Sequence, residues 1–228
     1  MHNDFRYTPF TSERESLVAN CARIMATESD LHLATNQFLR SIGEYYGAKR
    51  AYVVQFYPEK GTLSNTYEWC AKDATPEIDT LQDLPIDVCS DWIKAFHTQG
   101  SFYVSSLDRH FDPNSDTYQI LDRQNITSLM ASPMIENGTL IGFLGVDDLS
   151  KNQDDPSILK VAAYFIIEQN TKQKMIDDLK KSSYTDLLTG LFNRNLYIEK
   201  LNQYADHHPE SLGVIFIDIN GLKRTNDQ

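Results

Sequence analysis

The sequence SLMASPMIENGTLIGFLGVDD, residues 128–148, contains the clearest secondary-structure signal of this chain. Two apolar runs flank Asn137-Gly138, and Asn-Gly is the pair that most favours a tight turn with positive φ. A tight turn between two such runs makes them antiparallel neighbours in a sheet. The stretch therefore predicts a β-hairpin.

A second hairpin is predicted upstream. The runs AYVVQFY (51–57) and TLSNTYEWC (62–70) are rich in β-branched and aromatic residues, and the break between them ends in Gly61. Two antiparallel strands are expected here, so the chain supplies two hairpins for one sheet.

The segments around these hairpins are helical or irregular. Apolar residues over 13–47 recur at helical spacing and predict one helix or two. Residues 71–128 are irregular, with a short helical pattern around Trp92 and a predicted strand at 102–104. Irregular segments of this kind often carry binding groups.

A long helix is predicted over residues 157–182, roughly 39 Å at about 1.5 Å per residue. Asp155 precedes Pro156, the order expected of an N-cap followed by proline in the first turn. For 161–167, which is apolar nearly all round, packing on the sheet is an equally good interpretation. The other interpretation is a coiled coil, whose seam would consist of Ile158, Ala162, Phe165, Gln169, Lys172, Ile176 and Leu179.

This order of elements resembles a GAF domain over residues 12–155, joined to a linker or signalling helix at 156–182 whose first half could belong to the domain. The resemblance implies an α+β fold, with a GAF-like six-stranded antiparallel sheet and flanking helices. A PAS domain is the competing sensor fold. The resemblance names no sensor ligand, and a small-molecule effector is only one of the alternatives.

The sequence SYTDLLTGLFNR, residues 183–194, resembles the D-x-L-T-G-L-x-N-R opening of GGDEF domains, the diguanylate cyclases. A helical run, LYIEKLNQYAD, follows it. Next comes SLGVIFIDINGLKRTNDQ (211–228), in which Val214 to Ile217 is predicted to be a strand buried on both faces. Residues 183–228 are thus expected to be the truncated N-terminal part of a ferredoxin-like αβ GGDEF domain.

The resemblance assigns roles to four residues of this segment. The carboxylate of Asp218 and the backbone carbonyl of Ile219 would bind Mg²⁺, the metal that hard oxygen ligands suit. Lys223 would contact the phosphates of GTP as a point charge, and Asn226 would hydrogen-bond the guanine. Without the resemblance, an acidic turn residue is the simpler interpretation of Asp218.

The family's GG(D/E)EF hairpin does not occur in residues 1–228, so no catalytic residue is assigned and the chain is predicted to be inactive. Asn220 and Leu222 stand where many relatives have an acid and an aromatic residue. The predicted function is the sensory and regulatory region of a protein that makes cyclic di-GMP from two GTP. The alternative is a ligand-binding or dimerisation module that controls a degenerate, GTP-binding but non-catalytic GGDEF domain.

Composition limits the partners of this 228-residue chain. Its net charge of −11 disfavours nucleic acid and anionic lipid. No run approaches the roughly 20 apolar residues of a membrane span, so a cytoplasmic location is expected. Cys21, Cys70 and Cys89 lack the spacing of a zinc site or a disulfide framework and are expected to be reduced. A homodimer through the GAF domain and the linker helix is predicted.

Three groups of residues are candidates for binding the sensor ligand, and none is assigned to it. Most of the aromatic residues are expected to belong to the core, and the two histidines lack metal-site spacing. The acids lack the pattern of a calcium loop and are expected to cap or to be solvated. The groups are Trp69, Trp92, Phe96, Phe102, Phe111 and Tyr118; His97 and His110; and Asp147, Asp148, Asp154 and Asp155.

Overall fold

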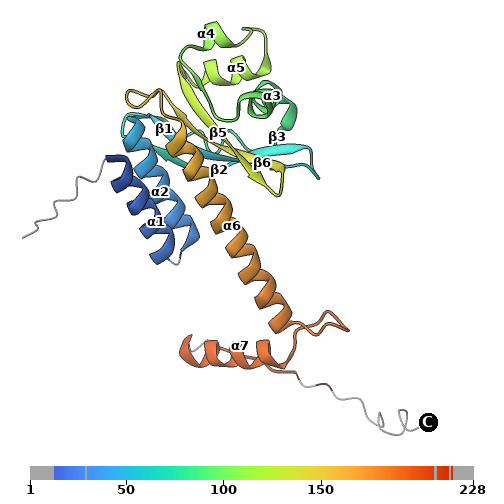
Figure 1. Cartoon of the computed structure of the whole chain (residues 1–228). Helices are drawn as coiled ribbons and strands as arrows, with labels where there is room; N and C mark the ends of the chain where they lie inside the picture. Colours follow the sequence, from blue (N-terminus) through green and yellow to red (C-terminus); the bar gives the residue numbers. More distant parts are fainter. Residues whose placement is uncertain (1–12, 29, 208–209, 216, 218–228) are drawn as a thin grey trace, which may run out of the picture. The chain divides into compact units, whose positions relative to one another are not determined.

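The computed structural model describes residues 13–28, 30–207, 210–215 and 217 (Figure 1). The chain divides into two units, of which the first ends at residue 172 and the second begins at residue 173.

The first unit contains one six-stranded sheet, and every pair of neighbouring strands in it is antiparallel, as the resemblance implied. The order across the sheet is β3-β2-β1-β6-β5-β4. The strands are β1 (Arg50–Tyr57), β2 (Thr62–Cys70), β3 (Leu84–Pro85), β4 (Phe102–Val104), β5 (Leu129–Glu136) and β6 (Thr139–Asp147).

Both predicted hairpins are confirmed, and they meet in the middle of the sheet. Asn137 and Gly138 have φ values of 50° and 80°, the left-handed pair of a type I′ turn between β5 and β6. β6 then pairs with β1 on its other side, which places the two hairpins next to each other.

Helices cover both faces of the sheet (Figure 1). The apolar pattern over 13–47 forms two helices, and the side chain of Asp30 caps the second by accepting hydrogen bonds from the backbone N–H groups of His32 and Leu33. One face packs against α1 (Glu13–Thr27), α2 (Leu31–Tyr46) and the first half of α6 (Ser157–Tyr184), and the other against the 3₁₀ turn η1 (Ile86–Cys89), α3 (Ser90–Gln99), α4 (Leu107–His110) and α5 (Asp116–Arg123).

The strand β1 contributes to both cores. Successive side chains of a strand point to opposite faces. Ala51 and Val53 therefore pack against α2 and α6, whereas Tyr52 and Val54 face α3 and α5. This double burial explains why AYVVQFY is almost continuously apolar instead of alternating.

The start of α6 is held by a side chain from α2. Tyr46, which is fully buried, donates its hydroxyl to the carbonyl of Asp155 at 2.8 Å and accepts from the backbone N–H of Leu159 at 3.2 Å. Asp155 also accepts from the N–H of Ser157 at 3.0 Å, as predicted for the N-cap. A tyrosine far away in sequence thus satisfies an N–H that the first helical turn leaves without a partner.

The first half of α6 packs on the sheet and does not form a coiled coil. Ile158 and Ala162, two positions of the predicted seam, are buried in the core that lies against α2. Leu159, Ala163 and Ile166 are buried there as well, because the helix is apolar nearly all round in this part. The seam prediction is therefore wrong for this half, and the packing interpretation is right.

The second unit contains the end of α6 and the predicted second helix, α7 (Arg194–His207). The predicted strand over 214–217 is not observed: Val214, Ile215 and Ile217 are outside any strand and are exposed. A strand exists only when a neighbour takes up its backbone hydrogen bonds, and no described residue pairs with this run. Phe216 lies outside the described residues.

The hydrogen bonds of the Tyr46 hydroxyl can be tested with Tyr46→Phe. The substitution leaves the buried N–H of Leu159 without its partner and should lower the free energy of unfolding by about 1–3 kcal/mol, measured by urea denaturation. Tyr57→Phe is the control, because the Tyr57 hydroxyl has no hydrogen-bond partner among the residues that the structure describes. It should change stability by less than about 0.5 kcal/mol. Equal losses in the two variants would refute the role of the hydroxyl.

Candidate functional site

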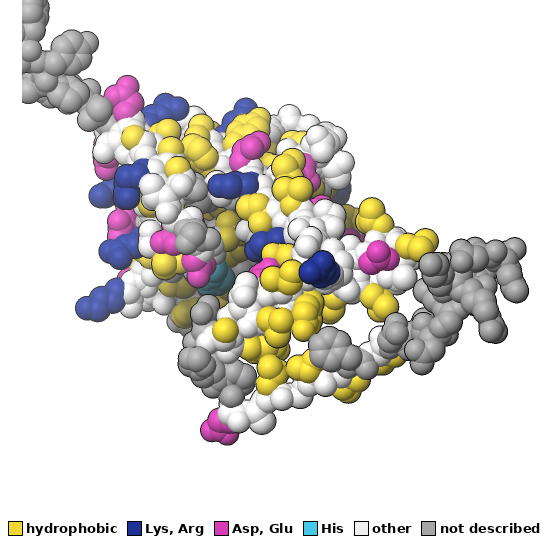
Figure 2. Space-filling view, turned by 90° about the horizontal axis from the view of Figure 1, so that it is seen from below, with side chains coloured by type: hydrophobic (Ala, Val, Ile, Leu, Met, Phe, Trp, Pro, Cys, Tyr) yellow, Lys and Arg dark blue, Asp and Glu magenta, His cyan; other side chains and the backbone are white. Residues whose placement is uncertain are grey.

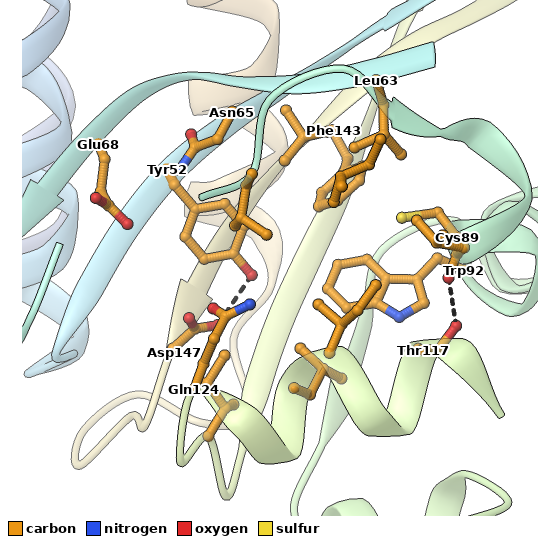
Figure 3. A pocket seen from close by; sticks show the side chains of 17 residues that line it. Tyr52, Leu63, Asn65, Glu68, Cys89, Trp92, Thr117, Gln124, Phe143 and Asp147 are labelled. Carbon is orange, nitrogen blue, oxygen red and sulfur yellow. Dashed lines mark hydrogen bonds between the residues drawn. The ribbon is translucent and has the colours of Figure 1, made fainter. Parts of the chain in front are cut away.

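A small cavity lies between the sheet and the helices η1, α3 and α5 (Figure 3). Its volume is about 60 Å³, far below the roughly 300–1,000 Å³ of pockets for drug-sized ligands. Val54, Leu63 and Phe143 give the sheet side an apolar surface, and Trp92 and Leu121 do the same on the helix side. Only a few polar groups enter this apolar space.

A β-bulge brings two polar residues of β2 to the cavity. The pairing of β1 with β2 shifts register between Val53 and Val54, so that Asn65 lies opposite Val54 and Glu68 opposite Tyr52. Residues three apart in a regular strand point to opposite faces, but the extra residue lets Asn65 and Glu68 share one. Both line the cavity.

The polar end of the cavity is formed by Tyr52 and Asp147. The Tyr52 hydroxyl donates to Oδ1 of Asp147 at 2.9 Å (Figure 3). The Tyr52 ring crosses β6 at Gly145, where a Cβ atom would lie 2.5 Å from the Cζ atom of the ring. Glycine is therefore needed at 145 for the tyrosine to reach the carboxylate.

Asp147 forms an ion pair with Arg50, and both side chains are buried. Nε of Arg50 lies 3.4 Å from Oδ2 of Asp147. The guanidinium also donates to the carbonyl of Thr75 at 3.4 Å and to the carbonyl of Gln124 at 3.2 Å. The expectation that Asp147 only caps or is solvated is wrong, because the residue is 1% exposed.

The pKa values of the two neighbouring acids at the end of β6 are shifted in opposite directions. Burial raises the pKa of Asp147 to about 7, although Arg50 and the Tyr52 hydroxyl favour the charged form. Partial burial also acts to raise the pKa of Asp148, but hydrogen bonds from Thr127, Lys49 and Ser128 outweigh it and lower this pKa. Asp148 is thus a capping acid, as expected, whereas Asp147 belongs to the cavity.

Two polar groups of the cavity wall lack hydrogen bonds. Asn65 is 1% exposed, and neither its side-chain oxygen nor its nitrogen has a partner among the described residues. The indole N–H of Trp92 also lacks one within the described part of the chain. Glu68, by contrast, accepts from the backbone N–H groups of Glu77 and Ile78. Buried polar groups are nearly always paired, so these exceptions mark the cavity as a place for a ligand or for water.

The cysteines are free thiols, as expected. Cys89 lines the cavity, and burial raises its pKa to about 12. Cys21 lies in the opposite core, where burial likewise raises its pKa to about 12. Thiols with such pKa values are protonated at neutral pH and react poorly as nucleophiles.

Of the aromatic residues considered for the sensor ligand, only Trp92 lines the cavity. Trp69 packs on the opposite face of the sheet, over Gly43 of α2. Phe96 and Phe102 are core residues, while Phe111 and Tyr118 pack at the edge of that core. His97 and His110 are exposed, and the described residues contain no group of three His, Cys, Asp or Glu suited to a metal ion.

Sequence reasoning missed Arg50, Tyr52, Asn65 and Phe143 as parts of the site. Two weak features of the sequence point to the site. Asn65 is a polar residue inside a predicted strand, and Asp147 ends a predicted strand with a second acid beside it. Neither feature shows that the two residues face the same cavity.

The predicted metal and nucleotide residues Asp218, Ile219, Lys223 and Asn226 lie outside the described residues. The D-x-L-T-G-L-x-N-R segment before them is described and forms a tight turn. Asp186 accepts from the N–H of Thr189 at 2.8 Å, and Gly190 has a φ of 69°.

Asn193 connects this turn to the helix that follows. Its side chain donates to the carbonyl of Ser183 at 2.8 Å and accepts from the N–H of Asn195 at the start of α7. The polar residues of the segment therefore have structural roles. Its leucines are different, because Leu187 and Leu188 are 91% and 94% exposed.

Comparison with known families agrees with this architecture. Residues 30–167 match the GAF domain family. The chain belongs to the GAF family. Residues 183–228 match the diguanylate cyclase GGDEF domain, which follows the GAF domain in the predicted order.

Two curated relatives share part of the sequence. The methanogenesis regulatory histidine kinase FilI of Methanothrix harundinacea (strain 6Ac) is 30% identical over 55% of this chain and 15% of its own length. Diguanylate cyclase DgcP of Escherichia coli (strain K12) is 28% identical over 45% of this chain and 34% of its own length. The chain thus spans about a third or less of either relative.

The GAF fold also agrees with solved structures. The phycoerythrobilin-bound GAF domain of a cyanobacterial phytochrome superposes with a TM-score of 0.58 at 12% identity, covering 72% of this chain and 97% of that one. This likeness concerns the fold. Among the described residues, no helix is both long and apolar enough to span a bilayer.

The raised pKa of Asp147 predicts a pH-dependent stability. Folding raises this pKa above the roughly 4 of an unfolded aspartate, so protonation stabilises the GAF domain. The stabilisation is complete below about pH 4 and is lost as the pH rises to about 7. The quantity to compare is the free energy of unfolding of the unmutated chain minus that of the Asp147→Asn variant. This difference should fall by roughly 1.4 kcal/mol per pH unit between about pH 5 and 7, and then level off.

Chemical denaturation at a series of pH values measures this difference. Asp122→Asn, at an exposed position of α5, is the control and should leave the shape of the pH curve near 7 unchanged. A difference between the chain and Asp147→Asn that stays flat over this range would show that Arg50 keeps Asp147 ionised in the folded protein.

Proposed function

We propose that this chain is the sensory and regulatory region of a diguanylate cyclase, a protein that joins two GTP molecules into cyclic di-GMP. The observation that carries the proposal is the continuity of α6. Ile166 of this helix is buried in the core of the GAF domain, and the same helix runs to Tyr184, where the GGDEF match has begun. The Escherichia coli relative named as a diguanylate cyclase supports it.

The cavity is connected to α6 through the end of β6. Asp147 lines the cavity, and the backbone N–H groups of Ser150 and Lys151, a few residues later, donate to the carbonyl of Tyr46. The hydroxyl of Tyr46 holds the start of α6. A ligand that binds two arrangements of this connection with different affinity would change the helix, and through it the cyclase.

The proposal includes a homodimer through the GAF domain and α6. The reaction needs two GTP molecules, and each GGDEF domain would hold one, so two such domains must meet. Tyr164, Met175 and Leu179 are exposed apolar residues of α6. At about 100° per residue they fall within roughly 60° of one another around the helix. Such a stripe suits a helix–helix contact.

The segment after α6 would be completed by further sequence of the GGDEF domain. Apolar side chains are open on the surface in Figure 2. By their exposed fractions, Leu187, Leu188 and Phe192 belong to the exposed apolar residues of the chain. A soluble domain normally covers such residues.

In the complete GGDEF domain, Asp218 and Ile219 would hold Mg²⁺, while Lys223 and Asn226 would bind GTP. The use of GTP suits a cytoplasmic location.

A polypeptide of these 228 residues should produce no cyclic di-GMP. It lacks the GG(D/E)EF hairpin, and with it the acid that completes the family's metal site. Incubation with GTP and Mg²⁺, followed by chromatography and mass spectrometry of the products, measures this. Cyclic di-GMP formed at a rate proportional to protein concentration would contradict the assignment.

In a polypeptide that continues through a whole GGDEF domain, Asp218→Asn should lower the rate of cyclic di-GMP synthesis by on the order of 100-fold or more, because a charged ligand of the metal is lost. The matched control is Asp178→Asn, at an exposed position of α6, which should keep the activity. GTP binding without synthesis in the unmutated polypeptide would favour the degenerate-domain alternative.

A further inference from the structure

Asn65 presents a complete amide to the cavity without a partner for it. Its side-chain oxygen can accept hydrogen bonds and its nitrogen can donate two, yet neither atom has a partner in the described part of the chain. The residue is 1% exposed and lines the cavity (Figure 3). Leaving such a group unpaired is costly, so a native occupant would restore both kinds of hydrogen bond.

The wall of the cavity narrows the choice of occupant. Val54, Leu63 and Phe143 are apolar and suit a short hydrocarbon group. At about 60 Å³, the cavity is less than half the size of an engineered apolar cavity of about 150 Å³ that binds benzene. The occupant therefore has only a few non-hydrogen atoms.

The acidic residues of the cavity wall disfavour an anion as the occupant. Glu68 and Asp147 both line the cavity, and the nearby cation, Arg50, already forms an ion pair with Asp147. A carboxylate ligand would lose its hydration without gaining a cation of its own. The indole N–H of Trp92 offers one more donor, which suits a neutral carbonyl oxygen.

We propose that the cavity binds a neutral primary amide or urea-type molecule of a few non-hydrogen atoms, held by a pair of hydrogen bonds to the side-chain amide of Asn65. Such a molecule carries an N–H donor beside a carbonyl acceptor, the complement of what Asn65 offers. A ketone pairs with only the donor of Asn65, and an anion is repelled. The regulatory role of this ligand, as a signal that acts on α6, rests on the proposed function. Its binding to the GAF domain does not.

Propionamide is the probe, titrated into the ¹⁵N-labelled chain of 228 residues and followed by amide chemical shifts. We expect saturable binding with a dissociation constant on the order of 1 mM or tighter, given the small size of the ligand. Propionate and butanone have the same number of non-hydrogen atoms. Each should bind at least about tenfold more weakly, because one carries a charge and the other lacks a donor.

Two substitutions in the cavity test the site. Asn65→Leu keeps the size of the side chain but removes both polar atoms and should weaken propionamide binding by at least about tenfold. Val54→Ile fills part of the cavity, leaves the polar groups in place, and should also weaken binding, which preserves the test if the first variant does not fold. Asn36→Leu on α2 is the matched control and should bind as the unmutated chain does.

Any of three results would overturn the inference. Propionamide and butanone could bind equally well, Asn65→Leu could leave binding unaffected, or no saturable binding could be seen because the cavity holds only water. Propionamide that binds through Asn65 but does not alter cyclic di-GMP synthesis in the longer protein would refute the regulatory function alone. The two failures are therefore distinguishable.

Discussion

The position of β6 between β1 and β5 is the constraint on which the rest of this GAF domain depends. Because both edges of β6 are paired and both faces are covered, its side chains alternate between two cores. Leu144 and Val146 support α2 and α6, while Phe143 and Asp147 face the cavity. One strand thus contributes at once to the cavity wall and to the core that lies against α2 and α6.

The cavity combines apolar packing with polar groups that a stable core would avoid. A buried ion pair such as Arg50 with Asp147 contributes little to stability, since desolvation offsets most of the attraction between the charges. The side chain of Asn65 has no partner at all among the described residues. Departures from the usual rules of core packing concentrate at functional sites, and here Asn65 and Asp147 both line one small cavity.

The helix α6 has two different environments along its length. Its first half is apolar nearly all round and is buried beneath the sheet, with the Tyr46 hydroxyl at its start. Beyond Lys172 its residues are mostly polar and belong to the second unit. The same helix is therefore anchored in one unit and continues into the next.

The two hairpins, most of the helices and the two families can be predicted from the sequence, because their signals are local. These signals are Asn137-Gly138 for a turn, helical spacing over 13–47, and the D-x-L-T-G-L-x-N-R segment. The tertiary structure was needed to show that α6 packs on the sheet, and that Val214 pairs with no strand among the described residues. The cavity is the clearest case. Asn65 faces it because of a bulge, and Asp147 is buried by Tyr52, 95 residues away in sequence. Burial of a polar side chain depends on such distant neighbours, and no local pattern records them.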